Sequence, residues 1–396
     1  MRSRLFATAL AALTAAAGLL VPPAALAQEP TVRLLGEHTI AHRAVFEDTI
    51  VGGLSSIDRD PHTGDYALLS DDWSDHSPAR YYRAEIDLDA EGLHDVELTD
   101  VHLLRRPDGR TYPTIDQWRI EQHQHPEAER NVLGTVDPEE LRIDPWTGDV
   151  AWTSEGQRNQ PGGAASDDPI TVLMDPAIRV SDAQGAYQQE VPTATNEKMT
   201  FGESGPRVDD TLEGLTYAAG GTLLVSALES PLEQDGPVPT TEHGAHTRIT
   251  VHARHGAAVA QFAYPVDPVF AESPDPDGRG SNGVSSLVAY DTFDPSRYLV
   301  VERGYVVGVG SSVRVFEVST AEATDVLSRH SLVGGGFEPA SKRLLVDLAD
   351  IGAKLDNIEG ITWGPPLPTG ERTLLLVSDD NFSAAQTTRI TALAVG

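Results

Sequence analysis

The 396-residue chain contains no cysteine. This absence excludes disulfide bonds, thiolate metal sites and a cysteine nucleophile. The phosphate-loop pattern GxxxxGK[ST] and the GxSxG turn of α/β-hydrolases are also absent, so neither a P-loop enzyme nor a serine hydrolase of that type is indicated. A chain of this length without disulfides must draw its stability from a large apolar core or from bound ions.

Basic residues are scarce. The chain has 29 Lys and Arg against 60 Asp and Glu, which gives a formal net charge of −31. Nucleic-acid binding depends on neutralising phosphates with Lys and Arg, so we predict no nucleic-acid partner. Acidic surfaces favour solubility and can adapt a protein to salt. We assign most of the charge to those effects, but a few converging carboxylates could bind a hard cation.

Only the N-terminus has a long apolar run. Two arginines precede an apolar stretch over residues 5–21, and small residues follow it at 25–27. This is the pattern of a secretion signal, which we predict to be residues 1–27, cleaved after Ala27. No later segment is long and apolar enough to span a bilayer. The sequence therefore predicts one secreted domain over residues 28–396, without stable membrane insertion and monomeric.

Long amphipathic helical patterns are missing too, and short strand patterns dominate. One six-residue pattern recurs five times, beginning at Val51, Pro138, Leu212, Ser281 and Ile358. Each copy is followed, after a turn, by a short apolar run that ends in acid. The intervals of 87, 74, 69 and 77 residues exceed the roughly 40 to 50 residues of a bare propeller blade. The units therefore carry insertions or hide a weaker blade.

This recurrence predicts an all-β fold, a single β-propeller. We favour six blades and leave five or seven open. The strand-like ends of the chain, residues 32–40 and 389–395, are expected to pair and close the ring. A pair of β-sandwiches is the structural alternative, but it gives no reason for a recurring unit of this kind.

Several motifs occur in an order that resembles a known family. The most specific are Asn357-Ile-Glu-Gly-Ile-Thr-Trp-Gly-Pro and Arg372-Thr-Leu-Leu-Leu-Val-Ser-Asp-Asp-Asn-Phe, preceded by Leu68-Leu-Ser-Asp-Asp, Asp137-Pro-Glu-Glu, Leu212-Glu-Gly-Leu and Val301-Glu-Arg-Gly-Tyr. They are similar to the phytase-like proteins described as having esterase-like activity of phytase. The resemblance implies secretion, a β-propeller and hydrolysis of phosphate or other esters. Glu140 departs from it, because the family tends to have glycine there.

Acidic and amide side chains occupy matching positions in the repeats and at the ends of the apolar runs. The candidate metal ligands are Asp71, Asp72, Glu139, Glu155, Glu213, Glu229, Asn282, Glu302, Glu359 and Asp379. Ca²⁺ takes six to eight oxygen ligands in a tolerant geometry, so blades that each bring a carboxylate to one axis could bind it. The alternative is that each acid caps a strand or a turn. Gly52 stands at the matching position of the first repeat, so we expect a lopsided ring with substrate access there.

Three arginines lie beside these motifs: Arg80, Arg207 and Arg303. Guanidinium groups bind phosphate or carboxylate in a bidentate way, so we predict that they bind a small anionic ester substrate; each could instead pair with a local acid. Ca²⁺ would polarise the ester and a carboxylate would accept a proton from the attacking water. Glu213 and Glu359 are the catalytic candidates, as ligand or base. A non-catalytic propeller that binds a ligand or partner with structural calcium, and a lactonase-like carboxylester hydrolase, remain as alternatives.

Overall fold

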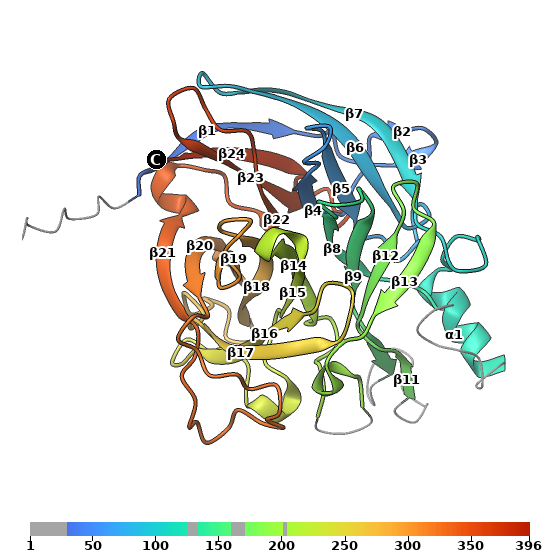
Figure 1. The fold of residues 1–396 in the computed structure, drawn as a ribbon, viewed down its shortest axis with the longest axis vertical. Coiled ribbons are helices and arrows are strands. Elements are labelled where there is room, and N and C mark those ends of the chain that lie inside the picture. Colours follow the sequence, from blue (N-terminus) through green and yellow to red (C-terminus); the bar gives the residue numbers. More distant parts are fainter. Residues whose placement is uncertain (1–29, 125–133, 160–170, 201–203) are drawn as a thin grey trace, which may run out of the picture. The chain divides into compact units, whose positions relative to one another are not determined.

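Five four-stranded antiparallel sheets are arranged around a common axis in the computed structural model (Figure 1). The structure describes residues 30–124, 134–159, 171–200 and 204–396, and residues from Thr31 onward form one compact unit. The expected secretion signal, residues 1–27, lies outside the described residues. Within the described ranges, no helix is long and apolar enough to cross a membrane.

Each sheet is one blade, and its strands are given from the axis outward. Blade 1 consists of β4 (Leu54–Arg59), β5 (Tyr66–Ser70), β6 (Arg80–Leu88) and β7 (Leu93–Leu103). Blade 2 consists of β8 (Pro138–Ile143), β9 (Val150–Ser154), β12 (Ala177–Ser181) and β13 (Tyr187–Val191). Blade 3 consists of β14 (Leu212–Ala218), β15 (Leu223–Leu228), β16 (Ala245–His252) and β17 (Ala258–Val266).

The last two blades follow the same plan. Blade 4 consists of β18 (Gly280–Ala289), β19 (Arg297–Val306), β20 (Gly310–Ser319) and β21 (Ser341–Asp347). Blade 5 consists of β22 (Asn357–Trp363), β23 (Arg372–Asp379), β24 (Arg389–Val395) and β1 (Val32–Thr39). The N-terminal strand thus completes the C-terminal sheet, with Val32 opposite Val395. The predicted closure by the two chain ends is confirmed.

The inner strands form an unbroken ring. β4 lies beside β8 and β22, β14 lies beside β8 and β18, and β18 lies beside β22. All five sequence repeats fall on these strands or at their starts, which confirms the propeller and excludes the sandwich alternative. The blade count is five, one of the counts left open, rather than the favoured six. The long intervals are explained by insertions and not by a hidden blade.

The insertions lie between strands. Helix α1 (Ile115–Gln124) follows blade 1, and the hairpin of β10 (Gln157–Asn159) and β11 (Thr171–Met174) separates β9 from β12. The two-stranded sheet β2 (Val45–Phe46) and β3 (Thr49–Ile50) precedes blade 1. Short 3-10 turns complete the elements: η1 (Thr195–Glu197), η2 (Ala219–Gly221), η3 (Glu233–Asp235) and η4 (Leu348–Ile351).

The apolar core lies between neighbouring sheets. Between blades 3 and 4, for example, Val225 and Ile249 belong to one buried cluster with Leu287 and Val300. Because both faces of a blade are covered, second strands such as β5 are buried along their whole length. Burial of a large aliphatic side chain contributes about 1.5 to 3 kcal/mol, so these inter-blade layers can stabilise the fold without disulfides.

A buried arginine closes the axis of the ring. The Arg142 guanidinium, on β8, donates to one carbonyl on each of the other four inner strands, at Ile57 (2.8 Å), Leu215 (2.7 Å), Leu287 (3.0 Å) and Ile361 (2.9 Å). One side chain therefore ties all five blades together. The side chain is 2% exposed and therefore lies at the buried centre of the ring.

Glu140 is the counter-ion of this arginine. Its carboxylate lies 3.2 Å from the Arg142 guanidinium and accepts hydrogen bonds from the hydroxyls of Ser56 and Ser286. Burial raises the pKa of Glu140 to about 8, although Arg142 and the two hydroxyls act to lower it. The departure from the family pattern at this position thus has a structural reason: the buried guanidinium has a carboxylate partner.

Candidate functional site

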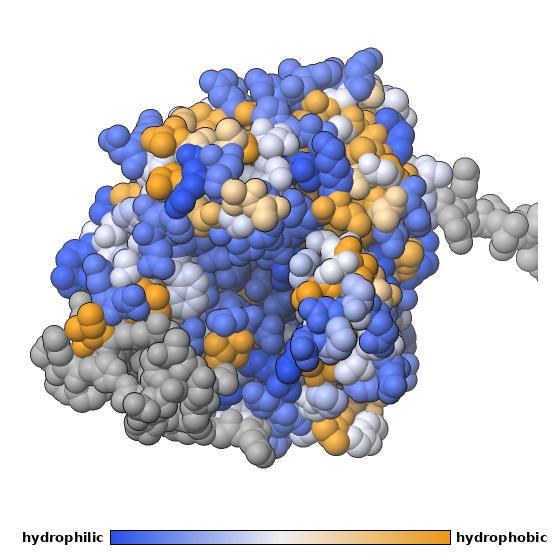
Figure 2. All heavy atoms as spheres, turned by 180° about the vertical axis from the view of Figure 1, so that it is seen from behind, coloured by the Kyte–Doolittle hydropathy of each residue, from blue (hydrophilic) through white to orange (hydrophobic). Residues whose placement is uncertain are grey.

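Acidic side chains gather where the inner strands begin and the second strands end. Neighbouring strands in each blade run antiparallel. The starts of the inner strands and the ends of the second strands therefore lie at the same end of the propeller axis. Figure 2 shows a face of the molecule that is hollowed near its centre, with hydrophilic walls. The repeats therefore bring together residues that are far apart in the sequence.

Two of the glutamates, Glu213 and Glu359, lie at β-bulges, where the pairing of the inner strand with the second strand is irregular. The register of β14 against β15 shifts between Leu212 and Gly214, around Glu213, and that of β22 against β23 shifts around Glu359. Such bulges kink a strand and re-aim a side chain, and they are common beside functional sites. Glu213 and Glu359 are nonetheless largely buried, at 7% and 8% exposure.

Three overlapping groups of carboxylates come close enough to share a cation. In each group the ligand oxygens lie within 4.8 Å of one another: Asp71, Asp137 and Glu139; Asp137, Glu155 and Asp209; and Glu139, Glu155 and Glu213. We call these six residues the acidic mouth. Four of the predicted ligands belong to it, namely Asp71, Glu139, Glu155 and Glu213.

Sequence reasoning missed Asp137 and Asp209. Asp137 immediately precedes the second repeat, so it belongs neither to the matching position inside the repeats nor to the acidic ends of the apolar runs. Asp209 lies in the segment before β14 and has a left-handed backbone (φ 57°), a conformation that non-glycine residues rarely adopt outside functional or tightly constrained sites. The signal for Asp137 was present in the sequence as a third acid beside Glu139 and Glu140.

Some buried oxygens in this region have no hydrogen-bond donor among the described residues other than a proton that Asp71 and Asp137 can share: Asp71 Oδ1, Asp137 Oδ1 and Asp379 Oδ2. Buried polar atoms are nearly always paired, so each such atom needs an explanation. A bound cation provides one, because it would be a partner for several of these oxygens at once. The available donors are all oxygen atoms, which suits a hard cation such as Ca²⁺ or Mg²⁺ rather than a soft metal.

Burial and mutual repulsion raise the pKa of these carboxyls. The pKa values of Asp137, Glu139, Glu155, Glu213 and Asp379 lie well above the usual range, first because of burial and then because of neighbouring carboxylates. Burial also raises the pKa of Asp71 to about 6 and that of Glu359 to about 7. Without a cation, the cluster cannot ionise fully at neutral pH except at a cost in stability.

Arg303 is the positive group of this region. Its guanidinium lies 3.1 Å from Glu229 and 3.3 Å from Glu359, and it donates to the Asn357 side-chain oxygen. Burial acts to lower the pKa of Arg303, but Glu359 and Glu229 raise it overall. The side chain is 20% exposed, and its Nε has no hydrogen-bond partner among the described residues.

The other candidate residues lie in separate networks. Arg80 is fully buried and pairs with Asp72 at 2.6 Å. Arg207 pairs with Glu233 at 2.7 Å. The Asn282 amide donates to Glu302, which also pairs with Lys342 and Arg314. These contacts agree with the alternative that Arg80 and Arg207 pair with local acids. Arg80 has no exposed surface through which it could contact a substrate.

The gap left by Gly52 is filled. A Cβ atom at Gly52 would lie only 2.8 Å from the ring of Phe382, and this ring stacks on His76 with centroids 4.0 Å apart. Phe382 has a left-handed backbone (φ 49°), which is strained for an aromatic residue. The expected opening beside the first repeat is therefore occupied by an aromatic ring rather than left free.

Without a cation, the propeller should lose stability as the pH rises. The folded-state pKa values of Asp71 and Glu359 lie above the values of about 4 in an unfolded chain. The folded protein therefore binds more protons between about pH 4 and pH 7, and its free energy of unfolding falls across that window. Thermal melts in chelator at pH 5, 6 and 7 measure the effect, and saturating calcium should reduce it. A melting temperature in chelator that rises steadily from pH 5 to pH 7 would contradict this prediction.

Comparison with known proteins gives one family match. The family model described as "Phytase-like: Esterase-like activity of phytase" matches residues 49–382. No curated protein matches the chain. Solved structures match over most of the chain with low similarity. A nidogen/laminin complex matches with a TM-score of 0.36 and 12% identity, over 93% of this chain and 97% of that one. A glucose dehydrogenase matches with a TM-score of 0.34 and 11% identity, over 92% of this chain and 99% of that one. Sqt1 of Saccharomyces cerevisiae matches with a TM-score of 0.30 and 10% identity, over 84% of this chain and 69% of that one.

Proposed function

The chain belongs to the phytase-like family described as esterase-like activity of phytase, and from this membership we propose that it is a Ca²⁺-dependent hydrolase of small anionic esters, with phosphoesters favoured. The acidic mouth is its site. The observation that carries the proposal is the convergence of carboxylates from three blades with buried oxygens that have no partner within the described ranges. Secretion through residues 1–27 and a monomeric state are parts of the same proposal.

Calcium is the cation that this donor set fits best. Asp71, Asp137, Glu139, Glu155 and Glu213 would hold it, since each offers an oxygen to one of the close groups. Ca²⁺ tolerates irregular geometry and high coordination numbers, whereas Mg²⁺ demands a near-ideal octahedron and retains several waters. When bound, the cation would polarise the ester and lower the pKa of a bound water.

Glu359 and Arg303 are suited to act directly on the substrate. Glu359 belongs to none of the three close carboxylate groups, so its carboxylate is available to accept a proton as a general base. Arg303 lies 3.3 Å from it, and its buried Nε has no hydrogen-bond partner among the described residues. We assign Arg303 to binding an anionic ester oxygen and Glu359 to proton transfer, while Glu213 serves as a ligand.

Replacing Glu359 with glutamine should lower the turnover of a phosphoester at least about 100-fold, the usual contribution of a general base. The assay measures phytate, phosphomonoesters, phosphodiesters and carboxylesters, each with calcium and with chelator. Glu322→Gln is the matched control, because it removes one charge from an exposed site on the β20–β21 connection.

The outcomes separate the alternatives. Calcium-dependent phosphoester turnover that falls in Glu359→Gln and persists in Glu322→Gln supports the proposal. Turnover of carboxylesters alone favours the lactonase-like alternative and contradicts the phosphoester assignment. Absence of any turnover, with calcium still bound, leaves a propeller that binds a ligand or a partner and uses calcium only for stability.

A further inference from the structure

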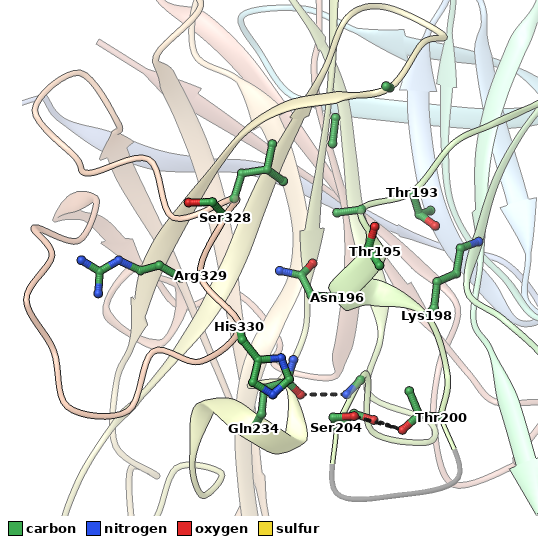
Figure 3. A pocket seen from close by; sticks show the side chains of 15 residues that line it. Thr193, Thr195, Asn196, Lys198, Thr200, Ser204, Gln234, Ser328, Arg329 and His330 are labelled. Atoms are coloured by element: carbon green, nitrogen blue, oxygen red, sulfur yellow. Dashed lines mark hydrogen bonds between the residues drawn. The ribbon is translucent and has the colours of Figure 1, made fainter.

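A separate cavity of about 460 Å³ opens on the outer part of the propeller. Its walls come from the segment after β13, from η3, from the start of β17 and from the β20–β21 connection. It shares no residue with the acidic mouth. Figure 3 shows Arg329 and Lys198 on opposite sides of the cavity, with Asn196, Thr195 and His330 between them. Its volume is in the range of pockets that hold small molecules.

The charge of this cavity is opposite to that of the protein. None of the 15 described residues that line it is Asp or Glu, whereas Lys198, Arg329 and His330 are all present. In a chain with 60 acidic and 29 basic residues, a described lining with basic side chains and no acid differs from the average composition of the protein. Such a lining attracts an anion and disfavours a cation.

The described part of the lining is rich in groups that hydrogen-bond to hydroxyls and includes no aromatic ring. Seven hydroxyl or amide side chains contribute to it: Thr193, Thr195, Asn196, Thr200, Ser204, Gln234 and Ser328. The apolar part consists of three alanines and Leu327. This composition suits a polyol more than a flat or greasy ligand, since hydroxyl and amide groups fix orientation through hydrogen bonds.

Several of these polar groups have no partner in the part of the chain that the structure describes. Lys198, His330, Thr195 and Ser328 lack a hydrogen bond or an ion pair there, so their donors are available to a ligand. Arg329 is different, because its guanidinium donates to the carbonyls of two glycines, 335 and 336. It contributes positive charge rather than a free donor, and Lys198 is the cation free to contact an anion.

The floor of the cavity is held in place by a satisfied network. The Asn196 amide donates to Gln261 at 2.9 Å. Gln261 in turn donates to Glu197 at 3.1 Å and to Thr250 at 2.9 Å, and it accepts from Arg248 at 2.7 Å. A buried network whose members are paired fixes the positions of its side chains. The cavity wall is thus arranged before a ligand arrives, which lowers the entropic cost of binding.

We propose that this cavity binds a sugar-sized polyol that carries one anionic group, a carboxylate or a phosphate. Lys198 would pair with the anionic group, His330 would donate to it or to a neighbouring hydroxyl, and the hydroxyl and amide side chains would contact the remaining hydroxyls. The site is distinct from the acidic mouth, and the proposal does not depend on hydrolysis there.

Isothermal titration of the intact protein with glucuronate, glucose 6-phosphate and glucose tests this. Glucuronate has no ester bond, so its binding is independent of the proposed hydrolysis; comparison with glucose 6-phosphate decides between carboxylate and phosphate. At least one anionic sugar should bind about tenfold or more tighter than glucose, a difference of about 1.4 kcal/mol. Lys198→Gln should remove that preference.

Lys354→Gln is the matched control, because this lysine is 69% exposed and distant in the sequence from the cavity-lining segments. It should leave the affinity unchanged. A second variant, His330→Gln, should weaken binding of the anionic sugar without lowering the melting temperature. The proposal is overturned if neither anionic sugar binds better than glucose, or if Lys198→Gln binds the preferred anion as well as the wild type does.

Discussion

Replacing Arg142 with methionine should destabilise the propeller by about 3 to 5 kcal/mol, the usual cost of removing one partner of a buried ion pair. The change leaves the Glu140 carboxylate buried without its counter-ion. It also removes the donor from one carbonyl on each of the other inner strands. Equilibrium denaturation with urea measures the loss.

The double variant Arg142→Met, Glu140→Leu separates the two causes. It should recover part of the lost stability, because it replaces a buried carboxyl that has lost its guanidinium partner with an apolar side chain, while the carbonyls stay without a donor. Arg343→Met, at a half-exposed site on β21, is the control and should change stability by about 0.5 kcal/mol or less. A wild-type free energy of unfolding in Arg142→Met would show that Arg142 does not tie the blades together.

Chelation should lower the melting temperature of the wild type, and Asp137→Asn should abolish most of this response. Asp137 belongs to two of the three close carboxylate groups, so its loss weakens both. A cation that binds only the folded state stabilises it by about 2.7 kcal/mol at 100 times its dissociation constant. The measurement is the difference between melts in calcium and in chelator at pH 7.

The metal-free form of Asp137→Asn carries a further expectation. It should be as stable as the metal-free wild type or more stable, because the substitution removes one of several mutually repelling carboxyls whose pKa values are raised by burial. Glu322→Gln, on the exposed β20–β21 connection, should keep the full calcium response. An equal response to chelation in wild type and Asp137→Asn would place any bound calcium outside the acidic mouth.

Much of the fold could be predicted from local patterns. The repeats at Leu212 and Ile358 mark inner strands, because a strand that faces the axis and two neighbouring sheets needs a nearly continuous run of buried residues. The pairing of residues 32–39 with 389–395 was also predictable, because both chain ends have short, alternating, strand-like sequences. The number of blades was harder to predict, because an inserted loop and an additional blade both lengthen the interval between two successive repeats.

The centre of the ring could not be predicted in the same manner. The partners of Arg142 are backbone carbonyls from four strands, and every residue has such a carbonyl. Nothing in the sequence therefore marks them. Arg80 shows the opposite case: its partner Asp72 is only eight residues away, and a local ion pair was the alternative that the sequence itself suggested.

The metal-site prediction assumed that side chains at aligned positions of the five repeats point to the same site. The structure supports this assumption only for some of the repeats. Glu213 reaches the acidic mouth, whereas Asn282, which aligns with it in the fourth repeat, hydrogen-bonds with Glu302. The repeats differ in where the strand bulges, at Glu213 in blade 3 and near Ser285 in blade 4. A shift of one residue turns a side chain to the other face of a strand, so aligned positions need not point the same way.

The most direct test of the account is a calcium titration of chelator-stripped protein by isothermal calorimetry. We expect saturable binding by the wild type and by Glu322→Gln, and at least about tenfold weaker binding, or about 1.4 kcal/mol, by Asp137→Asn. Absence of binding by the wild type, or equal affinity in wild type and Asp137→Asn, would contradict the central claim that the acidic mouth is a calcium site.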